Sequence, residues 1–202
     1  MQREVVERLA AQNRLAALAV EMAEQGRSTA GLPASASENE VRSALHWNEA
    51  GWSWPTYAPV VMAAVRAGAP VVGANLPKTQ MAAAMADDSL DSKLAAPALK
   101  AQQQAIRAGH CDLLPESQIA PMTRIQIARD RSMAQVLEKA IVPGKTVVLI
   151  AGNRHVDSRV GIPQHLRANV DAQVEVLPPE PQKKDYCASL RSKTDAGMPA
   201  GQ

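Results

Sequence analysis

The chain has 202 residues, a length that fits one domain, and hydrophobic residues make up 46% of it. Its 22 basic and 20 acidic residues leave a net charge of +2, and its aromatic residues are only three Trp and two Tyr, so we expect no nucleic-acid-binding surface. No apolar run approaches the roughly 18 residues of a membrane span, no signal peptide is visible, and no CxxC pair suggests a cysteine zinc site.

The first elements are predicted from the spacing of apolar residues. Residues 2–12 are charged on one side and apolar on the other, which predicts an amphipathic helix. Residues 15–20 form a short apolar run that favours a buried strand ending at Glu21. Residues 26–37 have the composition of a loop, and long loops are often functional.

Next, a capping signature and two apolar runs predict further elements. Ser37 and Glu40 have the spacing of a capping box, which begins a helix over 38–47. Residues 57–67 predict a helix with Pro59 in its first turn, where proline is tolerated. The remaining predicted elements are a strand over 70–77, mostly helical stretches over about 78–109 and 119–141, a strand over 145–152, a short helix over 161–169 and a last strand over 173–177.

Strands that alternate with helices predict an α/β fold with a mostly parallel sheet flanked by helices. We expect a single domain over residues 1–178, with a helical subdomain at about 78–143 inserted between strands. Residues 179–202 are polar and rich in Pro and Lys, which predicts a mostly disordered tail.

Polar residues follow three of the predicted strands and mark a candidate site. Glu21, Asn75 and His155 each lie where an apolar run ends. Ligands of parallel sheets bind beyond the carboxyl ends of the strands, so these side chains are expected to converge. The alternative is a structural role, in which Glu21 caps a helix or forms a salt bridge and His155 makes hydrogen bonds within the core.

The stretch 119–141 places polar residues within an apolar helical stripe. Gln126 and Arg129 fall inside the stripe and Asp130 borders it. Buried polar groups need partners, so these three residues either line the same pocket as Glu21 and His155 or form an internal ion pair with a neighbouring helix.

Aromatic residues gather in one short segment. Trp47, Trp52, Trp54 and Tyr57 lie within it, either as a platform for a planar ligand or as a hydrophobic plug. We favour the plug for the tryptophans. Tyr57 is a candidate ligand, since a tyrosinate can hold ferric haem iron.

Several segments together resemble the ChaN-like haem-binding family of the Tiki/erythromycin-esterase superfamily. They are ALAVEMAEQG, the W-x-W-x-x-Y-x-P stretch 52–59, PVVGANLP, GHCDLLPE, RIQIARDRSMA, VVLIAGNRHV followed by GIPQHL, and KKDYC. They run in order from about residue 17 to 187, and no single segment is diagnostic.

This resemblance implies a haem-binding protein linked to iron uptake or haem handling, in a family that is iron-regulated and found in the periplasm or as outer-membrane lipoproteins. It implies haem as cofactor and partner, and a homodimer around paired haems. Tyr57 would hold the iron, with Tyr186 the weaker candidate, and either His155 or His110 would assist. Lys78 or Arg129 would lie near the propionates. The resemblance also favours a disulfide between Cys111 and Cys187, although spacing alone fits two free thiols equally well.

The wider superfamily suggests a different function. It includes hydrolases that use Glu and His pairs, sometimes with a divalent metal ion, and Glu21 and His155 match half of that arrangement. The other half, a Gly-Glu-x-His segment on a first strand, is absent, so we expect an N-terminally truncated chain. Arg154 also replaces the glycine usual before this histidine. A metal-dependent hydrolase and a remnant without function therefore remain alternatives to haem binding.

Overall fold

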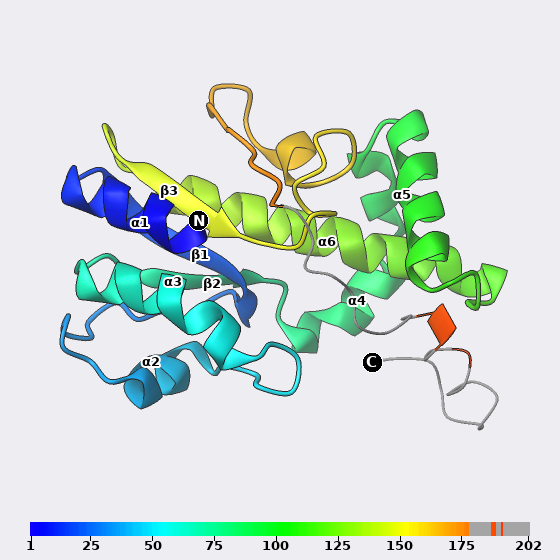
Figure 1. The fold of residues 1–202 in the computed structure, drawn as a ribbon. Helices are drawn as coiled ribbons and strands as arrows, with labels where there is room; N and C mark the ends of the chain where they lie inside the picture. The colour runs from blue at the N-terminus through cyan, green and yellow to red at the C-terminus, as the bar shows by residue number, and fades with distance from the viewer. Residues whose placement is uncertain (178–186, 189–190, 192–202) are drawn as a thin grey trace.

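The structure, a computed structural model, describes residues 1–177, 187, 188 and 191, and has a three-stranded parallel sheet covered by helices (Figure 1). Strand β1 (Leu15–Glu24) lies in the centre, between β2 (Val71–Asn75) and β3 (Thr146–Ile150), and pairs with both in parallel. This arrangement confirms the predicted α/β class with a parallel sheet flanked by helices.

The central strand is longer than its sequence pattern predicts. The apolar run ends at Val20, but β1 continues to Glu24, so Glu21 lies within the strand and not at its end. Between Val20 and Glu24 the register with β2 shifts, because Val20 pairs with Gly73 and Glu24 with Asn75. An irregularity of this kind bends a strand and redirects its side chains. Gly73 permits it, since a Cβ there would collide with the backbone of Glu24.

Helices cover both faces of the sheet, as an all-parallel sheet requires. On one face α1 (Gln2–Ala11), α2 (Glu38–Leu45) and α3 (Trp54–Arg66) pack with Leu18 and Val20 of β1. On the other face α6 (Glu116–Ala140) and the 3₁₀ helix η3 (Ile162–His165) pack around Ala19. The alternation of Leu18, Ala19 and Val20 therefore places one core on each side of β1.

The predicted helical segment is inserted between β2 and β3. It contains η1 (Lys78–Gln80), α4 (Met81–Ala86), η2 (Asp88–Lys93) and α5 (Ala96–Gly109), followed by α6. A third apolar cluster, which includes Leu76, Leu90 and Ile127, holds these helices against α6. In Figure 1, α4, α5 and the first half of α6 extend beyond the carboxyl ends of the strands.

Most predicted elements agree with the structure, and the exceptions have local causes. The capping box is present, since Ser37 and Glu40 each accept a hydrogen bond from the backbone of the other. Helix α3 begins at Trp54, three residues earlier than predicted, with Pro55 in its first turn, so Pro59 lies inside the helix.

The predicted strand over 173–177 is wrong. These residues have no regular structure, and the side chains of Val174 and Val176 are exposed. Their alternating pattern is typical of a strand, but a strand also needs a neighbour to pair with. The predicted short helix over 161–169 is the single 3₁₀ turn η3.

A disulfide joins α5 to the C-terminal part of the chain. Cys111, just after α5, forms a disulfide with Cys187, 76 residues further along the chain. The predicted disordered tail over 179–202 lies outside the described residues, apart from 187, 188 and 191. Within the described residues, no helix has the length and apolar character that crossing a membrane requires.

We expect the double variant Cys111→Ser, Cys187→Ser to unfold with a free energy about 2–4 kcal/mol below that of the oxidised wild type, because a cross-link over 76 residues restricts the unfolded chain. Denaturant unfolding with and without reductant measures this difference. Reductant should affect the wild type and leave the double variant unchanged. Identical wild-type curves under both conditions would contradict the expectation.

Candidate functional site

A network of polar side chains lies at the carboxyl end of the sheet. Glu21 comes from β1, Asn75 is the last residue of β2, and His155 lies in the turn after β3. Helix α6 adds the three polar residues predicted from its stripe. Hydrogen bonds join all six into one network: Glu21, Asn75, Gln126, Arg129, Asp130 and His155. The structure therefore brings together every predicted site residue except Tyr57.

Glu21 is the centre of this network. Its Oε1 accepts a hydrogen bond from Arg129 Nη2 at 2.7 Å and lies 3.2 Å from His155 Nε2. Its Oε2 accepts a hydrogen bond from the backbone N–H of Gly152 at 2.7 Å. The residue is only 3% exposed, and burying a carboxylate is costly without such partners. Three donors, two of them cationic groups, offset that cost.

His155 lies between two carboxylates. Its Nδ1 is 2.5 Å from Asp130 Oδ1, and its Nε2 faces Glu21. Gln126 also approaches the ring, and the end of its side-chain amide lies 3.0 Å from Nδ1. Because Nδ1 donates to Asp130, the amide oxygen of Gln126 is the atom suited to face the ring, since amide orientation is assigned from the hydrogen-bond network. Both imidazole nitrogens are thus engaged.

The two carboxylates keep this imidazole protonated. Burial lowers the pKa of His155, but the hydrogen bonds and negative charges of Asp130 and Glu21 outweigh burial and raise it to about 9. Burial acts to raise the pKa of Glu21, yet His155, Gly152 and Arg129 together lower it. For Asp130 burial prevails over the opposing effect of His155 and raises its pKa to about 6. At neutral pH the network therefore holds an imidazolium between two carboxylates.

Asp130 is the most deeply buried member of the network. It is fully buried, and its Oδ2 has no hydrogen-bond partner among the described residues. An unpaired buried carboxylate oxygen disfavours the charged form, which agrees with the raised pKa of this group. The helical stripe placed Asp130 at its border, whereas the structure places it inside, next to Ile127 and Met133 along the buried face of α6.

Arg129 is the partly exposed charged member of the network. Its Nε donates to Asn75 Oδ1 at 2.9 Å, and its Nη2 donates to Glu21. Asn75 is itself fixed, because its amide donates to the carbonyl of Glu21 and its Oδ1 also accepts from the backbone of Leu76. The Arg129 side chain is 23% exposed, against 4% for the Glu21 side chain. The guanidinium is thus held from within and open to solvent on one side.

Tyr57 lies on the other side of the sheet, in a cluster of aromatic rings. Its ring centroid is 5.8 Å from that of Trp47 and 5.9 Å from that of Trp52. Trp47 also meets Trp54 edge-on, and all four residues pack in or against the core of this face. Tyr57 is in the first turn of α3. Because α3 runs antiparallel to β2, this first turn lies at the same end of the sheet as the polar network (Figure 1).

Three other residues that the sequence analysis discussed lie outside the network. His110 Nδ1 bonds with the carbonyl of Ile106 in the preceding helix α5. Lys78 is exposed, and its backbone N–H donates to Glu24. Arg154 reaches the carbonyl of Ala105 on α5 instead of entering the network. Sequence reasoning missed the backbone N–H of Gly152 as a donor to Glu21, since the residue type carries no signal for it.

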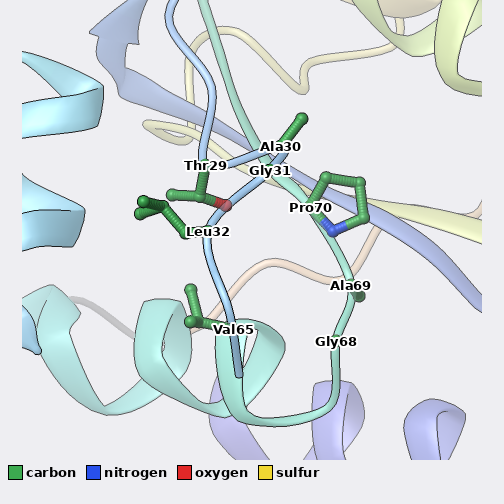
Figure 2. Close-up of a pocket in the computed structure, with 8 residues that line it drawn as sticks. All are labelled: Thr29, Ala30, Gly31, Leu32, Val65, Gly68, Ala69 and Pro70. Carbon is green, nitrogen blue, oxygen red and sulfur yellow. The ribbon is translucent and has the colours of Figure 1, made fainter. Parts of the chain in front are cut away.

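Two open hollows lie on the described part of the molecule, and both are away from the polar network. A cavity of about 250 Å³ lies where α3 leads into β2, at the amino end of that strand; Figure 2 shows its small lining side chains and Thr29. A groove of about 800 Å³ runs between α1 and α3, with Trp54, Ala58 and Met62 among its lining residues. Neither is lined by Tyr57 or by a residue of the network. The described residues also contain no group of three or more His, Cys, Asp or Glu arranged to hold a metal ion.

Comparisons with known proteins point to one family. A family model described as haem-binding uptake, Tiki superfamily, ChaN matches residues 1–166. The fold is similar to that of ChaN of Campylobacter jejuni, solved in a study of cofacial haem binding, with a TM-score of 0.57 and 22% sequence identity. That similarity covers 80% of this chain and 66% of the other, so the chain spans about two thirds of its length. No curated protein matches the sequence.

The pKa of His155 predicts how stability depends on pH. We expect the free energy of unfolding to fall as pH rises from 6.5 to about 9, because there the folded protein keeps the His155 proton that the unfolded chain has released. The fall is at most about 3 kcal/mol. It should be absent in His155→Gln, and denaturant unfolding at several pH values measures it.

The exposed residue His46 provides the control. His46→Asn removes an imidazole at a position with positive φ, which Asn tolerates, and should keep the wild-type pH dependence. A folded His155→Gln variant that loses stability over the same pH range as the wild type would show that another group titrates.

Proposed function

Because this chain belongs to the ChaN family of haem-binding uptake proteins in the Tiki superfamily, we propose that it binds ferric haem at the carboxyl end of its sheet. The family match, which extends over residues 1–166, is the observation that carries the proposal. We extend the proposal to a role in iron uptake or haem handling, which the family description supports.

The donor chemistry at this end of the sheet fits such a ligand. Tyr57 offers a phenolate oxygen, a ligand type found on ferric haem iron. Trp47 and Trp52 contact its ring at a tilt and edge-on, and so hold the tyrosine in an apolar setting. Bound haem would supply a Lewis-acidic ferric iron. In this proposal Tyr57 holds the iron, while Trp47 and Trp52 exclude water from the bond.

The protonation of the polar network favours binding over hydrolysis. A general base needs a free lone pair near neutral pH, but both nitrogens of His155 are engaged and its pKa is raised to about 9. Glu21 is a weakened base, because its lowered pKa reflects the His155, Gly152 and Arg129 donors around it. We therefore assign this network a role in holding and orienting the site, and not in attacking a substrate.

We also propose that two copies of the chain pair around their bound haems. The support comes from ChaN of Campylobacter jejuni, which binds haem cofacially and shares this fold. Light scattering after size exclusion, with and without haemin, measures the mass. A doubling of the mass on adding haemin is expected, and a haem-loaded monomer would contradict this arrangement.

Haemin titration of a Tyr57→Phe variant tests the iron ligand. We expect the wild type to develop a tyrosinate charge-transfer band, and the variant, which lacks the phenol oxygen, to lose it and bind haemin at least about tenfold more weakly. The second tyrosine, Tyr186, gives a matched control, and Tyr186→Phe should keep the band.

Each result identifies a different ligand. Loss of the band in Tyr186→Phe but not in Tyr57→Phe would make Tyr57 the wrong assignment. A wild-type protein that shows no spectral change with haemin would argue against haem binding altogether.

A further inference from the structure

One edge of the Arg129 guanidinium is already used inside the protein. Its Nε and one hydrogen of Nη2 bond to Asn75 and Glu21. A guanidinium carries five N–H donors in a fixed plane, so three remain: two on Nη1 and one on Nη2. Among the described residues, the structure records no partner for Nη1. The edge formed by Nη1 and Nη2 is therefore available to a ligand.

This free edge keeps its positive character despite the neighbouring carboxylate. Glu21 Oε1 faces two cationic groups, Arg129 and the protonated His155, so its single charge does not neutralise both. Asp130 is on the far side of His155, paired with Nδ1. The guanidinium also cannot turn away, because Asn75 and Glu21 hold it at two points. A fixed and partly exposed cation suits an anion better than a mobile surface lysine does.

The position of Arg129 agrees with a ligand contact. It bonds with Asn75, the last residue of β2, at the end of the sheet where parallel sheets bind their ligands, and it is a partly exposed cation beside the buried Glu21 and His155. Planar oxyanions with two oxygens match the guanidinium edge and form two parallel hydrogen bonds with it. A carboxylate has this shape.

We propose that Arg129 is the receptor for a carboxylate of the bound ligand and that Glu21 and Asn75 are the positioning residues that aim it. The inference rests on the haem-binding function proposed above and assigns Arg129 to a porphyrin carboxylate. In this proposal the buried network positions the Arg129 guanidinium. His155 and Asp130 fix Glu21, and Glu21 fixes Arg129.

The test uses iron-free protoporphyrin IX and its dimethyl ester, followed by fluorescence titration. Neither probe carries iron, so Tyr57 ligation does not affect the result, and only the free acid offers carboxylates. We expect the wild type to bind the free acid about tenfold or more tightly than the ester. In Arg129→Gln this preference should disappear, so that the dissociation constants of the free acid and the ester are nearly equal.

A matched variant separates local recognition from overall charge. Lys139→Gln removes one positive charge from an exposed site on the same helix and should keep the wild-type preference. Arg129→Lys keeps the charge but loses the planar edge, so its preference should fall between the other two. It also serves if Arg129→Gln does not fold, as a melting curve will show. Inorganic phosphate should weaken binding of the free acid and spare the ester.

Several results would overturn the assignment. They are a wild-type protein with no preference for the free acid, a folded Arg129→Gln or Arg129→Lys variant with the full wild-type preference, and an equal effect of phosphate on both probes. A wild-type protein that binds neither porphyrin nor haemin would contradict the proposed function, and the inference that rests on it would then be wrong as well.

Discussion

The imidazolium of His155, held between the carboxylates of Asp130 and Glu21, is the interaction on which the carboxyl end of the sheet depends. It joins three segments that are distant in sequence: the central strand, the longest helix and the turn after β3. All three groups are buried, so removing one leaves an uncompensated charge, which costs about 3–5 kcal/mol for buried pairs in general. The turn at 152–155 is held by this interaction and by the Gly152 N–H on Glu21.

The other features of this edge follow from the same constraint. Glu21 follows the apolar run of β1 within the register shift, and its carboxylate accepts hydrogen bonds from α6 and from the turn. Asn75, at the end of β2, ties the carbonyl of Glu21 to Arg129. Among the charged groups of the network, Arg129 is the one that is partly exposed to solvent. This edge therefore presents a cation that is held at two points, and the charged groups that support it are buried.

The two faces of the sheet contribute different chemistry to this edge. The face covered by α1, α2 and α3 brings Tyr57 and the tryptophans, which are apolar and aromatic. The face covered by α6 brings charge and hydrogen-bond donors. An amphipathic ligand with a planar apolar body and carboxylate groups matches this division, and the family to which the chain belongs binds such a molecule.

Local sequence patterns determined the elements and their order, because periodicity and capping depend on near neighbours. Apolar runs identified all three strands of the described sheet, Ser37 and Glu40 marked the start of α2, and polar residues after apolar runs indicated where the polar network lies. Only the tertiary structure decided which groups pair. The extension of β1 past Glu21, the lack of a partner for residues 173–177, the full burial of Asp130 and the link between Cys111 and Cys187 all depend on contacts between distant segments. A sequence pattern indicates that a residue is buried, but its partner, and hence its charge and its role, follows from the packing of the whole chain.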